Sequence, residues 1–197
     1  MKPKIILIGG GGHCKSSIDV IEQIDEFTIA GIVDINLSVE NLFGYPLLGN
    51  DENLSKLKEK YEYALITIGQ IKTPSIRIKL FDYIKSIGFK LPIIISNKAY
   101  VSKHAQIGEG SIVMHGGLIN AGAIIGKNCI INTKALIEHD VIVGDHCHIS
   151  TGAIVNGGAN IGCGTFVGSN AVTKESVNTK EFDFIKSGSL FMGYANE

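Results

Sequence analysis

Four consecutive groups of six residues decide the fold: residues 125–148 read IGKNCI, INTKAL, IEHDVI and VGDHCH. Each group opens on isoleucine or valine and has a small or aliphatic fifth residue. The pattern runs without insertion from Val101 to Val172, and its twelve first positions are all valine or isoleucine. A period of six fits neither an alternating strand nor an amphipathic helix. It is typical of a parallel β-helix, in which each repeat needs stacked neighbours to bury its apolar face.

If three groups of six complete one coil, a side chain recurs above itself every 18 residues. This spacing stacks Cys129 and Cys147 in the interior, where a buried thiol behaves as a small apolar group and not as a nucleophile. Thirteen of the 24 glycines lie between Gly108 and Gly168, many at the second or fourth position of a group. We interpret these glycines as structural, because glycine tolerates positive φ and the close approach of neighbouring coils.

The first half of the chain has a different pattern, in which strands alternate with helices. All four prolines lie at or before Pro92, and only six of the 68 residues from Ala105 to Val172 are charged, so we expect two domains, 1–95 and 96–197. The apolar spacing predicts strands over 4–9, 28–33, 63–68 and 91–95 and helices over 13–24, 54–60 and 76–87. This order indicates an α/β, Rossmann-like domain whose parallel sheet binds ligands at the carboxyl ends of its strands.

The composition excludes several classes of protein. A formal net charge of −1 argues against a nucleic-acid binder that relies on a basic face. The chain has no apolar run long enough to span a bilayer, and its start lacks the features of a signal peptide. The four cysteines form no CxxC pair. We therefore expect a cytoplasmic protein that uses neither disulfides, nucleic acid nor a membrane.

A glycine cluster marks a candidate phosphate site in the first half. Gly9–Gly12 and His13 lie between the first strand and the first helix, where backbone N–H groups and the helix dipole favour a phosphate. Cys14 stands where both the P-loop and the dinucleotide fingerprint need glycine. Asp34 ends the second strand, where a carboxylate can accept hydrogen bonds from a ribose or a base. We favour a nucleotide-containing ligand over the alternative, a glycine turn with a solvated aspartate.

The second half contains a candidate general base. His139 lies between Glu138 and Asp140. A histidine with acidic neighbours suits proton abstraction, because its pKa is near neutrality and a carboxylate can fix its tautomer. The alternative is an exposed polar turn. His146 and His148 could chelate a metal ion, but no histidine pair has helical ligand spacing, so we expect no metal.

Two stretches together resemble a known family. Residues 9–21, GGGGHCKSSIDVI, and residues 131–150, INTKALIEHDVIVGDHCHIS, are similar to the sugar acetyltransferases that include the sialic acid O-acetyltransferases and the bacillosamine-pathway UDP-4-amino-sugar N-acetyltransferases. The resemblance extends from the first strand to about residue 172. It implies a left-handed β-helix, a homotrimer, acetyl-CoA in the groove between neighbouring helices and a nucleotide-sugar on the Rossmann-like domain. Residues 174–197 depart from the family's usual proline-containing ending.

The resemblance also implies roles for individual residues. His139 matches the catalytic base and Asp140 the acidic residue that orients it. The other matches are Asn132 at the substrate site, His148 near the acetyl group, Gly157 with a backbone amide toward the thioester, Gly10, Gly11, Gly12 and His13 in the phosphate loop, and Asp34 facing the nucleotide. The implied reaction is N-acetylation, from acetyl-CoA, of the 4-amino group of a nucleotide-linked deoxy-amino sugar in bacterial surface glycan biosynthesis. The alternatives are O-acetylation of a sialic-acid-like sugar and a non-enzymatic trimeric scaffold.

Overall fold

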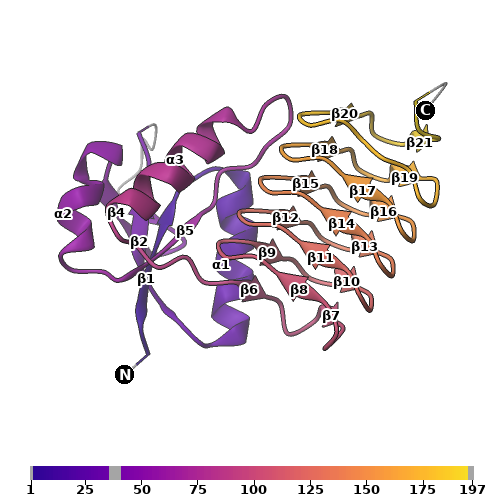
Figure 1. Ribbon diagram of the computed structural model, residues 1–197. Helices are drawn as coiled ribbons and strands as arrows, with labels where there is room; N and C mark the ends of the chain where they lie inside the picture. Colours follow the sequence, from indigo (N-terminus) through magenta and orange to yellow (C-terminus); the bar gives the residue numbers. More distant parts are fainter. Residues whose placement is uncertain (1, 36–40, 195–197) are drawn as a thin grey trace. The chain divides into compact units, whose positions relative to one another are not determined.

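The computed structural model describes residues 2–35 and 41–194 and contains two compact units (Figure 1). The first unit comprises Met1–Gly69 and Ile76–Pro92, and the second comprises Gln70–Ser75 and Ile93–Glu197. The segment from Gln70 to Ser75 therefore belongs to the second unit, the chain then returns to the first unit, and from Ile93 onward it stays in the second. The boundary expected at residue 95 lies close to this second passage.

The first unit is built on a five-stranded sheet in the order β3-β4-β2-β1-β5. Its strands are β1 (Lys4–Ile8), β2 (Thr28–Val33), β3 (Asn41–Leu42), β4 (Tyr45–Gly49) and β5 (Tyr63–Ile66). Its helices are α1 (Gly12–Ile24), the 3₁₀ turn η1 (Asp51–Asn53), α2 (Leu54–Lys58) and α3 (Ser75–Ser86), whose first residue belongs to the second unit. The central strand β1 is an unbroken aliphatic run because both of its faces are covered: Ile5 to Ile8 are at most 1% exposed.

Two expectations about this sheet are wrong. The sheet is not wholly parallel, because β3 and β4 form an antiparallel hairpin at its edge that the sequence did not predict. The strand predicted over 91–95 does not join it either. Its last two residues form β6 (Ile94–Ile95), which pairs with Ile112–Val113 in the second unit. The reason is register: Ile95 lies six residues before Val101 and therefore belongs to the repeat.

The second unit is a left-handed parallel β-helix, as the period of six predicts. Short strands from coil after coil stack into three parallel sheets, so Ile131 pairs with Val113 on one side and Ile149 on the other, 18 residues away each time. Figure 1 shows these coils from β6 to β21. The first sheet contains β6, β9 (Ile112–Val113), β12 (Ile130–Ile131), β15 (His148–Ile149), β18 (Phe166–Val167) and β20 (Phe184–Ile185). The second contains β7 (Tyr100–Val101), β10 (Leu118–Ile119), β13 (Leu136–Ile137), β16 (Ile154–Val155), β19 (Val172–Thr173) and β21 (Leu190–Phe191), and the third contains β8 (Gln106–Ile107), β11 (Ile124–Ile125), β14 (Ile142–Val143) and β17 (Asn160–Ile161).

The first and fifth positions of each group of six fill the interior of this β-helix. Ile131, Ile137 and Ile149 are fully buried, and so are Cys129 and Cys147. The prediction that these two cysteines are packing residues is confirmed. The interaction with the Cys129 thiol and burial both raise the pKa of the Cys147 thiol, which keeps it protonated and unreactive at neutral pH.

Glycine serves two structural purposes in the coils. The fourth position of every group from Gly110 to Gly188 has a left-handed backbone, and half of these positions carry another residue, such as Asp140 with φ 59°. Second-position glycines have a steric reason instead. A β-carbon on Gly126 would lie 2.6 Å from the backbone nitrogen of Asp145 in the next coil. The glycine excess therefore reflects both turn conformation and coil contact.

The β-helix continues beyond the stretch that the repeat identifies. Phe184–Ile185 pairs with Phe166–Val167, and Leu190–Phe191 pairs with Val172–Thr173, each at the same 18-residue spacing. Residues 174–191 therefore form one more coil. After this coil, Tyr194 donates a hydrogen bond to Asp183, and the centroid of its ring lies 4.3 Å from Nζ of Lys180. These contacts cap the β-helix. No helix among the described residues is long and apolar enough to cross a membrane.

Candidate active site

His139 and Asp140 form an exposed dyad at one corner of the β-helix, directly after β13. The left-handed backbone of Asp140 turns the chain there. The turn brings the Asp140 carboxylate back to the ring, where Oδ2 lies 2.9 Å from Nδ1 of His139. The two side chains are 65% and 72% exposed. Sequence neighbours can form this contact only because the corner folds one onto the other.

The carboxylate fixes both the charge and the tautomer of His139. The hydrogen bond that His139 donates to Asp140 is the largest influence on the imidazole and raises the pKa of His139 above its ordinary value. Slight desolvation opposes this shift, and the charges of Asp140 and Glu138 add to it. Since a carboxylate can only accept, Nδ1 carries the hydrogen and Nε2 offers its lone pair when the ring is neutral. This arrangement suits a general base.

Glu138, the other acidic neighbour, is held in place by the preceding coil. Its Oε2 accepts a hydrogen bond of 2.8 Å from Nδ2 of Asn120, and the backbone N–H of His139 lies 3.2 Å from the same oxygen. Asn120 is 18 residues earlier in the chain and therefore one coil away. Glu138 thus contributes a fixed negative charge beside the imidazole.

The dyad opens into a groove of about 520 Å³ that runs along the corner. Its lining residues are Glu138, His139, Asn156, Gly157, Glu175 and Ser176. The structure therefore brings Gly157 and His139 together in one groove. Sequence reasoning missed Asn156, Glu175 and Ser176. Their positions could have been found, because Asn156 lies 18 residues after Glu138, and Glu175 lies two coils after His139.

Asn132 and His148 are elsewhere on the β-helix, and neither lines this groove. His148 is 7% exposed, and its Nδ1 donates a hydrogen bond of 2.6 Å to the backbone oxygen of Gln70. Its Nε2 then accepts from Nδ2 of Asn132 at 3.1 Å. The ring also contacts Phe166 edge to face, with 5.3 Å between the centroids. Within one chain, this pair holds the segment that begins at Gln70.

The predicted phosphate loop lies at the start of α1 in the first unit. Asp34 accepts a hydrogen bond of 2.5 Å from the backbone N–H of Gly10, so its carboxylate shapes the loop itself. The Thr67 hydroxyl also stabilises the loop by donating a hydrogen bond of 2.6 Å to the backbone oxygen of Gly9. Gly11 and Gly12 are exposed at the N-terminus of the helix, and Gly11 is its N-cap. The backbone of this loop therefore has the geometry that a phosphate prefers.

Further side chains around the loop include His13, Cys14 and Asp51. The β-carbon of His13 lies 3.7 Å from where one on Gly69 would be. Burial raises the pKa of the Cys14 thiol to about 11, although a hydrogen bond with Thr67 opposes the shift. Burial and the nearby charge of Asp34 raise the pKa of Asp51. Sequence reasoning missed this second carboxylate, which follows β4 and not one of the predicted strands.

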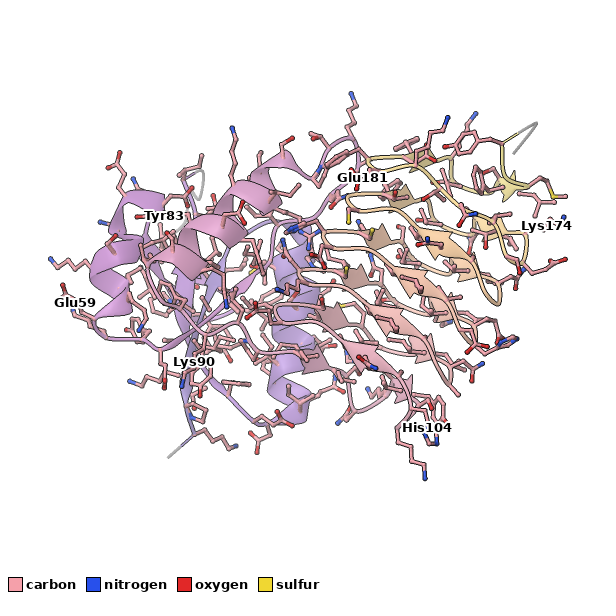
Figure 2. All side chains as sticks on the ribbon, viewed as in Figure 1. Glu59, Tyr83, Lys90, His104, Lys174 and Glu181 are labelled. Atoms are coloured by element: carbon pink, nitrogen blue, oxygen red, sulfur yellow. The ribbon has the colours of Figure 1, made fainter. Side chains whose placement is uncertain are left out.

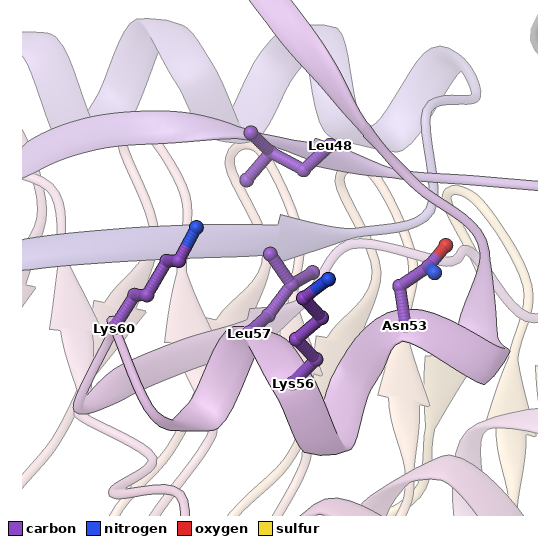
Figure 3. Close-up of a pocket in the computed structure, with 5 residues that line it drawn as sticks. All are labelled: Leu48, Asn53, Lys56, Leu57 and Lys60. Atoms are coloured by element: carbon purple, nitrogen blue, oxygen red, sulfur yellow. The ribbon is translucent and has the colours of Figure 1, made fainter.

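The first unit also has a smaller pocket of about 240 Å³, formed by α2 and β4 (Figure 3). Figure 3 shows Lys56 on α2 and Lys60 on the turn after it, near the strand that carries Leu48. Asn53 and Leu57 complete the lining. None of the residues that the sequence singled out as functional lines this pocket.

No group of three or more histidine, cysteine or carboxylate side chains in residues 2–35 and 41–194 could hold a metal ion. His146, one of the possible chelators, contacts Nδ2 of Asn128 at 3.0 Å through its Nδ1. The four cysteines, all in the described part of the chain, form no disulfide.

A three-sided β-helix built from groups of six, with a histidine and a carboxylate facing a corner groove, defines a hexapeptide-repeat acyltransferase. Residues 4–84 match the family model described as the PglD N-terminal domain. No curated protein matches the chain significantly. Among solved structures, perosamine N-acetyltransferase from Caulobacter crescentus, determined with CoA and GDP-perosamine, is 32% identical with a TM-score of 0.91; the match covers 96% of this chain and 89% of that one.

The acetyltransferase domain of PglB from Neisseria gonorrhoeae, also determined with acetyl coenzyme A, is 26% identical with a TM-score of 0.91. That match covers 98% of this chain and 92% of the other. WeeI from Acinetobacter baumannii, at 20% identity and a TM-score of 0.74, shares the fold. The chain belongs to the family of sugar acetyltransferases in which a PglD-type N-terminal domain precedes a hexapeptide β-helix. The resemblance seen in residues 9–21 and 131–150 is confirmed, and the protein is an acetyltransferase.

Proposed function

We propose that the protein transfers the acetyl group of acetyl-CoA to the 4-amino group of a nucleotide-linked deoxy-amino sugar, a step in bacterial surface glycan biosynthesis. The observation that carries this proposal is the His139–Asp140 dyad, in which His139 lines an open groove and its Nε2 has a lone pair when the ring is neutral. The similarity to an enzyme that N-acetylates perosamine supports an amine as the acceptor.

The reaction needs one base and no acyl-enzyme. Nε2 of His139 takes a proton from the sugar amine as its nitrogen attacks the thioester carbonyl, and a tetrahedral intermediate forms. When this intermediate collapses, the C–S bond breaks and the imidazolium returns the proton to the leaving sulfur, which departs as the CoA thiol. Asp140 keeps Nδ1 hydrogen-bonded and stabilises the transient positive charge of the ring. The backbone amide of Gly157 is our candidate donor to the thioester oxygen.

The first unit binds the nucleotide in this proposal. The backbone N–H groups of Gly11, Gly12 and His13 receive the diphosphate at the start of α1, with Gly10 and Asp34 shaping the loop. The roles of Asn132 at the substrate site and of His148 near the acetyl group rest on the family resemblance alone. Their hydrogen bonds to each other and to Gln70 favour a positioning role for the pair.

A homotrimer is part of the proposal, because apolar side chains are exposed on two neighbouring outer faces of the β-helix. One ladder, on the sheet of β13, consists of Tyr100, Leu118, Leu136, Ile154, Val172 and Leu190, all at least partly exposed. On the next sheet, Ile124 and Ile142 are 42% and 46% exposed. The two faces meet at the corner of His139, so a subunit packed there would cover the groove in which we place acetyl-CoA. Large exposed apolar patches mark such interfaces.

We also propose a cytoplasmic location. Four cysteines without a disulfide fit a reducing compartment. The proposed small-molecule partners are acetyl-CoA and a nucleotide-linked sugar.

Release of the CoA thiol from acetyl-CoA tests the proposed activity. The acceptors are nucleotide-linked sugars with a 4-amino group, the matching 4-hydroxyl compounds and free sialic acids. Amine-dependent release, together with a product heavier by one acetyl group, is the expected result. Release with sialic acids would replace the proposal by O-acetylation, and no release with any acceptor would favour a scaffold. Mass determination in solution checks the trimer separately.

A further inference from the structure

The side chain that is absent at Gly157 lies against the reacting end of His139. A β-carbon on Gly157 would lie 2.8 Å from Nε2 and 2.9 Å from Cε1 of the imidazole. Nonbonded carbon contacts are favourable only at about 3.5–4.0 Å. A single methyl group at position 157 would therefore force the ring to move or would cover Nε2.

The coil itself does not require glycine at this place. Gly157 is the third residue of its group of six and is not among the described residues with a left-handed backbone. The corresponding places on the same corner carry Ala121 one coil before His139 and Glu175 one coil after Gly157, as the backbone hydrogen bonds from coil to coil show. Side chains are thus accommodated at this corner. What distinguishes position 157 is the imidazole beside it.

A second missing side chain lies on the other side of the dyad. A β-carbon on Gly122 would overlap Oδ1 of Asp140. Gly122 has a left-handed backbone, with φ 76°, but the fourth position of other groups of six carries Asn128, Lys134 and Asn170 with a similar backbone. Glycine is therefore not obligatory there for the turn. The space that it leaves is filled by the carboxylate that holds His139.

We propose that Gly122 and Gly157 are positioning residues for the dyad: the coils before and after it leave a slot that keeps Nδ1 of His139 on Asp140 and Nε2 toward the groove. This inference rests on the proposed function, because it takes His139 as the base. It is separate from any hydrogen bond donated by the backbone N–H of Gly157, since alanine retains that group. The charged neighbours of the ring, Glu138 and Glu175, stay unchanged in the variants.

The test compares Gly157→Ala and Gly122→Ala with the unmodified protein in two measurements. Acetyl transfer as a function of pH reports on the base. NMR titration of the His139 ring, without any substrate, reports on its contact with Asp140. We expect Gly157→Ala to lower kcat by about 100-fold, because a misplacement of about 1 Å has that effect, while the KM for acetyl-CoA changes little. In both variants the pKa of His139 should fall toward its ordinary value as the bond to Asp140 is lost.

Gly152→Ala is the matched control. Gly152 also has a left-handed backbone, with φ 67°, and its β-carbon would overlap Oδ1 of Asn170, away from the dyad. We expect this variant to keep the wild-type rate and the wild-type His139 titration. A wild-type rate and titration in Gly157→Ala would overturn the slot, and so would an equal loss in Gly152→Ala. If Gly157→Ala does not fold, Gly122→Ala decides. The titration remains informative even if no acceptor sugar supports acetyl transfer, which would contradict the proposed function alone.

Discussion

At the scale of single residues, the proposed chemistry depends on Nε2 of His139. His139→Ala should lower kcat by about 10² to 10⁴-fold, the contribution of a general base, and should leave acetyl-CoA binding intact. Thiol release gives kcat, and calorimetry gives the Kd for acetyl-CoA. His104→Ala is the control, because His104 is an exposed histidine at the far end of the same β-helix (Figure 2). Turnover close to wild type in His139→Ala would contradict the assignment of the base.

Asp140 determines the pH at which this base works. The pKa of His139 is raised, chiefly by its hydrogen bond to Asp140. The rate should therefore fall, as pH is lowered, at a higher pH than an ordinary histidine with a pKa of about 6.5 would give. Asp140→Asn removes the main cause of the shift, so this acidic limb should move to lower pH.

The plateau rate of Asp140→Asn should fall as well, because the asparagine amide can donate to Nδ1 and leave the proton on Nε2. The pH profile of kcat measures both effects. An unchanged acidic limb would mean that His139 is not the group that titrates.

At the scale of the repeating element, neighbouring coils approach so closely at one corner that its second positions, Gly108, Gly126, Gly144 and Gly162, have no room for side chains. Gly126→Ala would place a carbon 2.6 Å from the backbone nitrogen of Asp145 and 2.7 Å from the carbonyl carbon of Gly144. Backbone atoms cannot rotate away, so we expect a loss of about 3 kcal/mol of unfolding free energy. Gly188→Ala, at a left-handed turn with open space, should lose only about 1 kcal/mol. Chemical denaturation of both variants makes the comparison, and equal losses would show that backbone conformation, not coil contact, selects Gly126.

The same element explains how far the sequence predicted the fold. Stacking places each interior residue over a similar one, so the repeated valines and isoleucines at the first positions, such as Ile131, predict the β-helix. Residues 174–191 form a further coil without that signal, because Thr173 and Thr179 occupy first positions and Asp183 a fifth position. Backbone hydrogen bonds to the preceding coil, such as Phe166 N–H to the oxygen of Asp183, need no particular side chain. A coil of this kind cannot be predicted from the repeat of apolar residues.

The candidate site divides in the same way. His139 and Asp140 are adjacent, so their contact could be anticipated from the sequence. Glu175 lines the same groove because it lies two coils after His139. This spacing along the chain predicts its position, whereas its neighbours in the sequence do not. The partner of His148 could not be predicted, because Gln70 lies in a short segment that leaves the first unit.

At the scale of the whole molecule, one feature of the β-helix points beyond a single chain. Its interior is complete, yet one outer face carries an apolar ladder and the adjacent face exposes Ile124 and Ile142, where a monomer in water would favour polar residues. Lys174 and His104 show that charged and polar side chains project from other places on the same unit (Figure 2). The corner between the two apolar faces carries the dyad. Assembly and activity should therefore depend on each other.

Ile142→Asp tests this dependence. Ile142 is 46% exposed on the face that it shares with Ile124, two residues after Asp140. A carboxylate there would have to be desolvated in an interface, so we expect the trimer to dissociate. Ile76→Asp, at an isoleucine that is 61% exposed on α3, is the control for adding the same charge outside the two apolar faces. Light scattering after size-exclusion chromatography gives the mass. Ile142→Asp should run as a monomer with little acetyl transfer, whereas Ile76→Asp should match the unmodified protein. A monomeric Ile142→Asp with full activity would show that one chain contains the complete site.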